Sequence, residues 1–502
     1  MKQGKIIVNK VYRKGKIDKR IYGSFVEHMG RVVYSGVYEP ENPCADEDGF
    51  RTDVLQAVKD AGITSIRYPG GNFVSCYHWE DGIGDKKLRP RRPELAWKAI
   101  ETNEFGTDEF MKWCKKAGTE PVLAVNLGTR GIEDAVHYLE YCNFQEGTTY
   151  SDMRKDNGHA EPYHVKTWCL GNEMDGMWQL GHKDAKDYGK LARETAKAMK
   201  VLDPSVELVS CGSSLNTMDT YPEWEAATLE ETYEFVDYIS LHQYFDGHEK
   251  NMIEFLAQAD EMNQYIKTVV SVCDYIKAKK RSEKELYISF DEWGVWTHHS
   301  EETVKECEGN PWKNAAPISE MIYSFQDSLL FAEMLMTLLK NADRVKIACQ
   351  SLLANISAMI MTEKGGGLWL QPNYYPFAHM ANYGKGEVMD VRINAPAYQK
   401  GTKQISFLDS VVVENAEEKE LVVFAVNRSE NQDMEVCVEI QGYKPVDIIE
   451  HKVMISEEPE ATNRESHGKI KPQDRKDMEI NGASVKGIFP KLSWNMVRIR
   501  TE

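Results

Sequence analysis

The chain has 502 residues, of which 42% are hydrophobic and 28% charged, as expected for a globular protein with a large core. Its formal net charge of −18 repels phosphate backbones and anionic lipids, so neither nucleic acid nor a membrane surface is an expected partner. No run of about 18 apolar residues could span a membrane, and the first residues lack the apolar stretch of a secretory signal.

Ten cysteines are scattered along the chain. None forms the C-x-x-C pair that is typical of zinc ribbons and thioredoxin-like sites. Unpaired thiols in a large chain are typical of a reducing compartment, so we expect a cytoplasmic protein.

Short apolar runs alternate with segments of helical periodicity over roughly the first two thirds of the chain. Such alternation predicts parallel strands joined by helical crossovers, and eight units predict a (β/α)8 TIM barrel in the α/β class. The predicted strands are Tyr22–Glu27, Thr64–Arg67, Pro121–Asn126, Val165–Leu170, Glu207–Cys211, Tyr238–His242, Leu286–Asp291 and Val345–Gln350. The predicted helices are Arg51–Ala61, Thr107–Ala117, Ile132–Cys142, Asp184–Leu202, Asn251–Lys279 and Ile318–Lys340.

The helical period disappears from about Gly384 onward. Short β-prone segments separated by Asn, Asp, Gly and Pro follow, which predicts an all-β sandwich of jelly-roll-like type. Lys5–Lys14 also has an extended pattern, so we expect it to add a strand to this sandwich. We therefore predict a catalytic barrel over residues 18–380 and a β-sandwich domain made of residues 1–17 and 381–502.

Two glutamates follow predicted barrel strands, at the end where barrel active sites lie. Glu173 comes after the fourth strand, preceded by Asn172, and Glu292 comes after the seventh, followed by Trp293. Either glutamate alone could be a solvated loop acid. Together they lie across the barrel mouth, and a retaining glycosidase needs two carboxyl groups about 5–5.5 Å apart, one as nucleophile and one as proton donor. Asp291 remains a competing nucleophile on sequence alone.

Other predicted strand ends carry polar side chains as well. Glu27 ends the first strand, Arg67 the second with Asn72 shortly after it, and Tyr244 follows the sixth. Sugar sites combine fixed donors and acceptors with an apolar floor. Any one of these residues could simply be a satisfied hydrogen-bonding group, but their positions on several strand ends favour a sugar site.

The motifs of other chemistries are absent from the sequence. The histidines show no H-E-x-x-H spacing, and the Gly70-Gly71 and Gly365-Gly366-Gly367 runs fit no phosphate-loop pattern. No G-x-S-x-G nucleophile elbow occurs. We therefore expect no metal site, no phosphate-binding loop and no serine nucleophile.

Four segments in order match a known family. They are GSFVEHMGRVVYSGVYEP (23–40), RYPGGNFVSCYHWEDGIG (67–84), WCLGNEMDGMWQLG (168–181) and SFDEWGVW (289–296). The chain resembles the retaining α-L-arabinofuranosidases of glycoside hydrolase family 51. The resemblance implies exo-acting hydrolysis of terminal non-reducing α-L-arabinofuranosyl residues, by double displacement, from arabino-oligosaccharides or from arabinoxylan and arabinan fragments. It also implies a homo-oligomer, either a trimer or a hexamer, and no cofactor.

The resemblance assigns roles to individual residues. It implies that Glu173 is the general acid/base and that Glu292 is the nucleophile that forms a covalent arabinosyl-enzyme. Asn172 would bind the 2-hydroxyl of the glycone, a contact that strengthens in an oxocarbenium-like transition state. The further substrate-binding positions that it implies are Glu27, Arg67, Asn72, Tyr244 and, near the aglycone, Trp296.

The chain departs from the family pattern in places. The nucleophile motif usually reads D-E-W-N-V-W, but Gly294 stands in place of the Asn. After strand eight the family usually reads A-Q-L-V-N, and an ungapped match places that Gln on Leu352. Gln350 lies nearby on the same strand face and could substitute for it. We expect these changes to affect preference around the glycone and to leave the carboxylate pair untouched.

Two alternatives remain on sequence grounds. One is a related retaining glycosidase, such as a β-xylosidase or an endo-β-glucanase. The other is a carbohydrate-binding protein that lacks catalysis, which the presence of both carboxylates disfavours.

Overall fold

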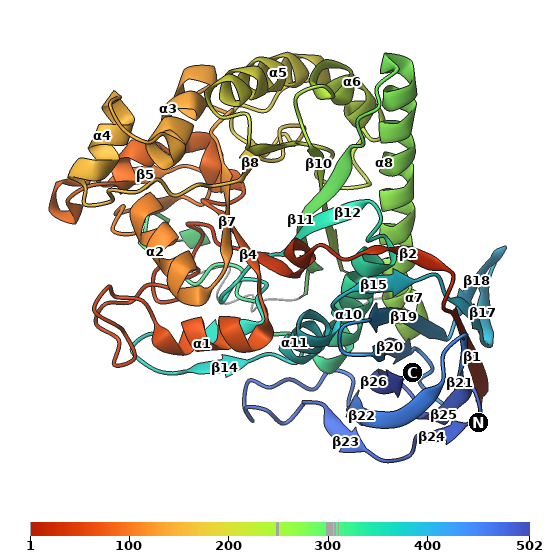
Figure 1. Cartoon of the computed structure of the whole chain (residues 1–502). Coiled ribbons are helices and arrows are strands. Elements are labelled where there is room, and N and C mark those ends of the chain that lie inside the picture. Colours follow the sequence, from red (N-terminus) through yellow and green to blue (C-terminus); the bar gives the residue numbers. More distant parts are fainter. Residues whose placement is uncertain (1, 247–249, 298–304, 306–307, 310) are drawn as a thin grey trace.

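The computed structural model describes the whole chain apart from residues 1, 247–249, 298–304, 306–307 and 310. Eight parallel strands close into a barrel, each beside the next in chain order, so the predicted (β/α)8 fold is confirmed (Figure 1). The barrel strands are β3 (Gly23–Phe25), β4 (Ser65–Tyr68), β7 (Glu120–Ala124), β8 (Thr167–Leu170), β9 (Glu207–Ser210), β10 (Tyr238–Phe245), β11 (Tyr287–Val295) and β12 (Val345–Gln350).

The barrel strands are short and almost wholly buried, as parallel strands covered on both faces should be. Every residue of β8 is buried, for example. Strands β10 and β11 are the longest, and their extra residues extend past the barrel on the side where the strands end. They carry the side chains after predicted strands six and seven into the barrel mouth.

Most predicted helices are present, with adjusted ends. The helices are α1 (Thr52–Ala61), α2 (Thr107–Ala117), α3 (Ile132–Asn143), α4 (Thr149–Asp156), α5 (Ala185–Leu202), α6 (Glu223–Thr232), α7 (Met252–Leu256), α8 (Gln258–Lys280), α10 (Phe325–Lys340) and α11 (Tyr374–Tyr383). Helix α2 begins at Thr107 as predicted, and the Glu109 carboxylate accepts a hydrogen bond from the Gly106 N–H, which caps its first turn.

Two helix predictions were wrong in detail, and three α-helices were missed within the part of the chain that the structure describes. The long helix expected from Ile318 begins only at Phe325, because the Ser324 hydroxyl caps it by accepting the Asp327 N–H. The helix expected over Asn251–Lys279 is divided into α7 and α8 at Ala257. Helices α4, α6 and α11 were not predicted.

Two β-sheets pack face to face beside the barrel and form the predicted all-β sandwich. The seven-stranded sheet consists of β2 (Arg13–Lys16), β15 (Glu387–Met389), β19 (Leu408–Asn415), β20 (Glu420–Asn427), β26 (Ser493–Thr501), β22 (Pro445–Ile455) and β23 (Gln473–Arg475). The five-stranded sheet consists of β16 (Arg392–Asn394), β1 (Lys2–Asn9), β21 (Met434–Gln441), β25 (Ser484–Phe489) and β24 (Glu479–Asn481).

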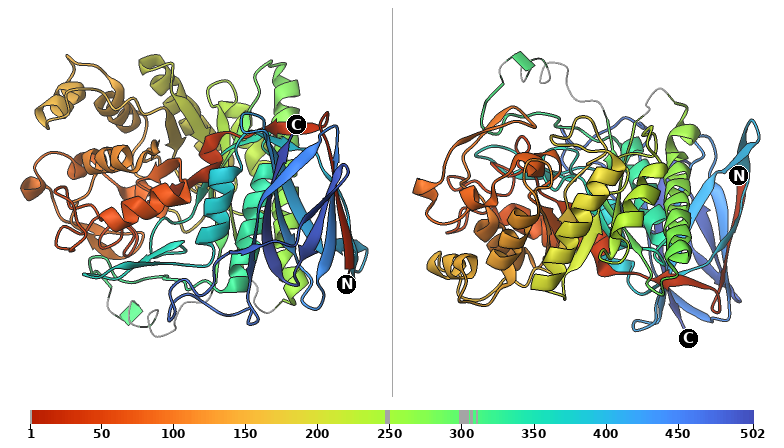
Figure 2. Two further views of the ribbon diagram at one scale, coloured as in Figure 1. Left: turned by 60° about the horizontal axis from the view of Figure 1, so that its bottom comes forward. Right: turned by 90° about the horizontal axis from the view of Figure 1, so that it is seen from above.

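The N-terminal segment belongs to this sandwich, and both termini lie on its side of the molecule (Figures 1 and 2). β1 pairs in parallel with β21 over eight residues, and β2 pairs with β15. The exact boundaries, 18–380 for the barrel and 1–17 plus 381–502 for the sandwich, stay a prediction. Helix α10 connects the two parts, because it belongs to the barrel layer and packs against β19, β20 and β26.

Among the described residues, no helix combines the length and the apolar character that crossing a bilayer requires.

Candidate active site

Glu173 and Glu292 meet at the barrel mouth, on the loop after β8 and near the end of β11. One carboxylate oxygen of each and one ring nitrogen of His242 lie within 4.8 Å of one another. Both side chains are buried, with residue exposures of 9% and 6%. The two glutamates that were predicted from strand ends are therefore neighbours in one enclosed site.

Glu292 is held by two donors, one on each oxygen. The Arg67 Nη1 donates to Oε1 at 2.8 Å, and the Tyr244 hydroxyl donates to Oε2 at 2.8 Å. Arg67 comes from the end of β4 and Tyr244 from β10, so two separate strands fix one carboxylate. The second Arg67 amino group donates to Asn172 Oδ1 at 2.7 Å. Since hydrogen bonds from a cation are among the stronger ones in proteins, this arrangement fixes the Glu292 carboxyl group in one orientation.

His242 bridges two carboxylates from the barrel interior. Its Nδ1 lies 3.0 Å from Glu173 Oε1, and its Nε2 lies 3.1 Å from Asp291 Oδ1. Burial alone would lower the pKa of His242, but the charge of Glu292 and the hydrogen bonds to Asp291 and Glu173 raise it to about 10. This geometry suits a protonated imidazole with one N–H group directed at Asp291 and the other at Glu173.

Glu173 sits in a strained and dry position. Its backbone φ is +44°, in the left-handed region that side chains other than glycine rarely adopt. Burial raises the pKa of Glu173, and the charge of Glu292 raises it further, while hydrogen bonds from His242 and Trp178 oppose both effects. A carboxyl group with a raised pKa is suited to donating a proton near neutral pH.

Asp291, the alternative nucleophile, lies deeper than Glu292, with an exposure of 1%. Its two oxygens face His242 Nε2 at 3.1 Å and Arg67 Nε at 3.7 Å. Burial would raise the pKa of Asp291, but the charges of Arg67 and His242 lower it below its usual range. This carboxylate is therefore a buried counter-ion below the site, and the geometry favours Glu292 for contact with substrate.

A short chain of amide contacts fixes Asn172. Its Nδ2 donates to Gln179 Oε1 at 3.3 Å, while the Gln179 amide donates to Ser75 Oγ. Gln179 also donates to the backbone oxygen of Asn72 at 3.4 Å. The predicted binding residues Asn172 and Asn72 are thus linked through Gln179. Asn72 opens the short helix η2 (Asn72–Cys76), directly after Gly71.

Glu27 forms another wall of the site. Its Oε1 accepts the Phe73 N–H and the Trp97 indole N–H, each at 2.9 Å. Burial raises the pKa of Glu27 to about 8, and these hydrogen bonds only partly oppose the shift. A Cβ at Gly71 would lie 3.0 Å from Glu292 Oε1 and 3.1 Å from Glu27 Oε2, so the glycine lets the backbone pass closely between the two carboxylates.

Aromatic side chains line the rim. The Trp178 indole donates to Glu173 Oε2 at 2.5 Å, and its residue is half exposed. The Trp296 ring packs edge-on against Tyr244, with a centroid distance of 5.7 Å, and is also partly exposed. Indoles of this kind offer apolar faces on which a sugar ring can stack.

The same groups have the spacing of a possible cation site, since ligand atoms of Glu173, His242 and Glu292 lie within 4.8 Å of one another. Both His242 nitrogens, however, face carboxylates at hydrogen-bonding distance. A protonated imidazole has no lone pair left for a metal, so a cation would have to displace this proton and break the His242 contacts.

Comparison with known proteins gives the family. The α-L-arabinofuranosidase 1 domain family matches residues 57–267, and the α-L-arabinofuranosidase C-terminal domain family matches residues 291–493. The intracellular exo-α-(1→5)-L-arabinofuranosidase 1 of Bacillus subtilis is 50% identical over 100% of both chains. The corresponding enzyme of Acetivibrio thermocellus is 48% identical over 99% of this chain and 100% of its own.

The chain belongs to the α-L-arabinofuranosidases of glycoside hydrolase family 51.

Solved structures agree with this assignment. The family 51 α-L-arabinofuranosidase AbfB from Bifidobacterium longum superimposes with a TM-score of 0.94, at 38% identity over 100% of both chains. The arabinose complex of the Thermotoga maritima α-L-arabinofuranosidase gives a TM-score of 0.87, at 32% identity over 99% of both chains. The protein is therefore a glycoside hydrolase, and the predicted family is confirmed.

In this arabinofuranosidase, the end of the eighth barrel strand, β12, differs from the family motif. Gln350 is fully buried, and its side-chain amide donates to the Ser357 backbone oxygen at 2.7 Å. Leu352, on the position of the family glutamine, is also buried. Between them, Ser351 Oγ lies 2.6 Å from the Tyr244 hydroxyl. The side chain from this strand end that reaches the nucleophile's network is therefore Ser351.

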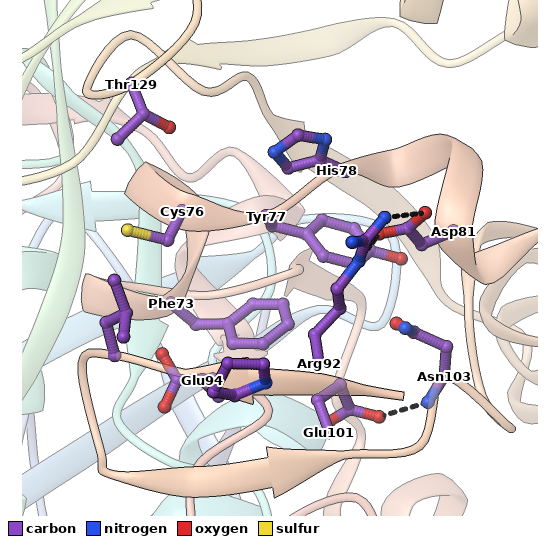
Figure 3. Close-up of a pocket in the computed structure, with 12 residues that line it drawn as sticks. Phe73, Cys76, Tyr77, His78, Asp81, Arg92, Glu94, Glu101, Asn103 and Thr129 are labelled. Atoms are coloured by element: carbon purple, nitrogen blue, oxygen red, sulfur yellow. Dashed lines mark hydrogen bonds and ion pairs between the residues drawn. The ribbon is translucent and has the colours of Figure 1, made fainter. Parts of the chain in front are cut away.

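A cavity of about 350 Å³ lies between η2 and the hairpin of β5 (Arg92–Glu94) and β6 (Ala99–Glu101) (Figure 3). Neither Glu173 nor Glu292 lines it, but Phe73, whose N–H binds Glu27, does. The Glu94 carboxylate at its wall accepts the N–H groups of Ala96 and Trp97, each at 2.7 Å. The hairpin thereby holds the indole that binds Glu27. The pair of Arg92 and Asp81 closes another wall.

Several residues of the site were not predicted from sequence. His242 stood at a predicted strand end, but nothing marked it as a bridge between two carboxylates. Trp178 and Gln179 lie in a matched motif, so aromatic and amide residues near the strand ends were the available signal, whereas Trp97 lies outside the motifs. No sequence pattern pointed to Ser351.

Proposed function

We propose that the enzyme is an exo-acting, retaining α-L-arabinofuranosidase in which Glu292 is the nucleophile and Glu173 the general acid/base. The observation that carries this proposal is the separation of the two carboxylates, at most 4.8 Å between one oxygen of each. Retaining glycosidases place these groups about 5–5.5 Å apart, whereas inverting enzymes need about 6.5–9.5 Å to admit a water.

In the first step, Glu292 attacks the anomeric carbon while Glu173 gives its proton to the glycosidic oxygen. The bond from the anomeric carbon to that oxygen breaks, the aglycone leaves as an alcohol, and an arabinosyl ester forms on Glu292. In the second step, the Glu173 carboxylate takes a proton from water, the water oxygen attacks the anomeric carbon, and Glu292 is released. The configuration is therefore retained.

The surrounding charges support this division of roles. Arg67 and Tyr244 hold both oxygens of Glu292, which orients the nucleophile. Burial and the charge of Glu292 raise the pKa of Glu173, so that it carries a proton when substrate binds. Once Glu292 is esterified its charge is gone, and Glu173 then becomes a better base for the attacking water.

Substrate contacts follow from the same geometry. We propose that Asn172, held by Arg67 and Gln179, binds the 2-hydroxyl of the glycone. Glu27, Arg67, Asn72 and Tyr244 would complete the glycone pocket, with Trp296 near the aglycone. Because the relatives at 50% and 48% identity are named α-(1→5)-specific, we propose terminal α-(1→5)-linked arabinofuranosyl residues as the substrate.

The cellular setting is proposed on the same basis. Those relatives are named intracellular enzymes, so we propose a cytoplasmic enzyme that acts on arabino-oligosaccharides or on arabinoxylan and arabinan fragments. We propose a homo-oligomer, either a trimer or a hexamer, as the family resemblance implies. Light scattering of the purified protein would distinguish these two states from a monomer.

Nucleophile and acid/base variants test the mechanism. On an aryl α-L-arabinofuranoside, Glu292→Ala should lower kcat by roughly 10⁴–10⁶-fold, as expected when a covalent nucleophile is lost. Glu173→Ala should lower it by about 10²–10⁴-fold. Azide should rescue Glu173→Ala and give an arabinosyl azide of retained configuration, detectable by NMR. Glu133→Ala, at an exposed helix position, is the control.

Two outcomes would contradict the proposal. Full activity in either active-site variant would refute its assigned role, and an azide product of inverted configuration would refute retention. A panel of disaccharides and polymers tests the substrate. Faster hydrolysis of an α-(1→6)-linked arabinofuranosyl disaccharide would point to the specificity named for a Bifidobacterium longum relative at 41% identity. Turnover of β-xylosides or soluble glucans alone would favour a related glycosidase, and arabinose binding without any turnover a binding protein.

A further inference from the structure

Tyr244 stands between Glu292 and Ser351. Its hydroxyl lies 2.8 Å from Glu292 Oε2 and 2.6 Å from Ser351 Oγ. Ser351 follows β12 directly and is buried. The ungapped match after the eighth strand aligns this serine with the alanine of the family motif A-Q-L-V-N. The family motif therefore has no hydroxyl at this position.

Counting hydrogens fixes the direction of the two bonds. A tyrosine hydroxyl carries one proton, and an ionised carboxylate can only accept. When Glu292 is ionised, Tyr244 must therefore donate to it. The short contact to Ser351 is then a bond in which the serine hydroxyl donates to the tyrosine oxygen. A hydroxyl that accepts one hydrogen bond donates a stronger one, because chained hydrogen bonds polarise one another.

The serine is placed independently of this contact. Its backbone N–H donates to the Trp293 carbonyl at 3.1 Å, which ties it to the strand that carries Glu292. Its hydroxyl position is thus set by the backbone, and the loss of the hydroxyl would leave that backbone bond in place.

Two further residues flank the Tyr244 ring. Gly294 faces it without a side chain, and a Cβ there would lie 3.8 Å from the tyrosine ring. Trp296 contacts the ring edge-on, at a centroid distance of 5.7 Å. Two departures from the family pattern, Gly294 and Ser351, therefore meet at the same tyrosine.

We propose that Ser351 is a positioning residue for the nucleophile and acts through Tyr244. Before reaction it orients the tyrosine hydroxyl toward ionised Glu292. In the arabinosyl-enzyme the ester oxygen is a weaker acceptor, and the two hydroxyls can rotate so that Tyr244 donates to Ser351. No proton changes its oxygen in this rotation. The hydroxyl pair keeps Tyr244 in place in both states. This inference rests on the proposed role of Glu292.

The test is a double-mutant cycle on an aryl α-L-arabinofuranoside. Ser351→Ala should lower kcat about three- to tenfold, the range of a single uncharged hydrogen bond, with KM within about twofold. Ser351→Thr, which keeps the hydroxyl, should recover most of the loss. In a Tyr244→Phe background, Ser351→Ala should change kcat by less than about 1.5-fold, because the group it acts through is gone.

Ser24→Ala is the matched control. Ser24 is equally buried, and its hydroxyl donates to the Gln350 backbone oxygen at 2.9 Å, so it contacts the same strand end without reaching Tyr244. It should keep kcat within about twofold. Circular dichroism and melting temperature should show that all variants are folded.

Three results would overturn the inference: a Ser351→Ala enzyme with unchanged kcat, a loss that adds in full to that of Tyr244→Phe, or an equal loss in Ser24→Ala. Different results would refute the proposed function. It would be refuted by a wild type without turnover of arabinofuranosides or by a fully active Glu292→Ala enzyme, neither of which depends on Ser351.

Discussion

Charged side chains are buried both at the barrel mouth and where the barrel meets the β-sandwich. At the second place, Arg428 after β20 donates to Glu333 of α10 at 2.8 Å and lies 3.8 Å from Asp409 of β19. Lys340, at the end of α10, pairs with Asp409. Arg428 also donates to the more exposed Asp260 at 3.3 Å, and burial raises the pKa of Glu333 to about 8.

The mouth also holds more carboxyl groups than cations. Glu173, Glu292 and Asp291 share only the cations of Arg67 and His242. One carboxyl group is therefore in excess, and the pKa of Glu173 is raised by burial and then by the charge of Glu292. The comparison teaches that position decides the role of a buried charge cluster: between two domains it joins them, whereas at the barrel mouth its proton can reach the substrate. The predictions below test this difference.

The largest effect should come from Arg67→Met. The variant loses two hydrogen bonds from a cation, to Glu292 and Asn172, and each is worth about 1.5–3 kcal/mol. We expect kcat/KM on an aryl arabinofuranoside to fall by about 10²–10⁴-fold. Arg130→Met, which removes a partly exposed arginine from its pairs with Glu80 and Asp134, should leave kcat/KM within about twofold. An Arg67→Met enzyme with wild-type kcat/KM would show that the excess charge at the mouth needs no fixed cation.

Arg428→Met should act on stability instead of catalysis. It leaves Glu333 and Asp409 without their shared cation, and breaking a buried ion pair in this way costs about 3–5 kcal/mol. Chemical unfolding should show a loss of that size, while kcat per folded enzyme stays within about twofold. A large loss of kcat with unchanged stability would contradict the separate roles of the two clusters.

Much of the barrel could be predicted because its strands are continuous apolar runs between periodic helices. Once the strands were counted, the strand-end rule led to Glu173 and Glu292. Helix α6, with the sequence EWEAATLEET, was missed because it has no clear apolar stripe. The start of α10 was misplaced because the cap at Ser324, and not the hydrophobic pattern, decides where it begins.

The network around the carboxylates could not be predicted, for a physical reason. His242, Asp291 and Ser351 act through contacts between β10, β11 and the end of β12, which lie 49 or more residues apart in the chain. No local pattern records which side chain of one strand faces which side chain of the next. The register of the closed barrel decides it.

Glu27→Gln should change how stability depends on pH. Burial raises the pKa of Glu27 from an ordinary 4.5 to about 8 in the folded protein, so the folded state binds an extra proton between these values. The contribution of Glu27 to the free energy of unfolding is therefore full below pH 4.5 and is lost as the pH rises through about 8. The uncharged amide lacks this dependence, so the melting temperature of Glu27→Gln should fall less between pH 5 and pH 8. A steeper fall in the variant would contradict the sign of the shift.

The smallest effect should come from Trp178→Phe. Burial, together with the charge of Glu292, raises the pKa of Glu173, and the Trp178 indole opposes the shift by donating to the ionised carboxylate. Loss of this donor should raise the pKa further. The protonated acid then persists to higher pH, so the alkaline limb of the kcat/KM profile should move upward in pH.

An aryl arabinofuranoside with a poor leaving group is the right substrate for this measurement, because its hydrolysis needs the proton from Glu173. Phenylalanine keeps an aromatic face at the rim, so we expect kcat at the optimum to stay within about threefold. Trp312→Phe, at another partly exposed tryptophan, is the control and should leave the profile in place. If the alkaline limb moved to lower pH, Trp178 would favour the protonated form of Glu173. That result would contradict the prediction.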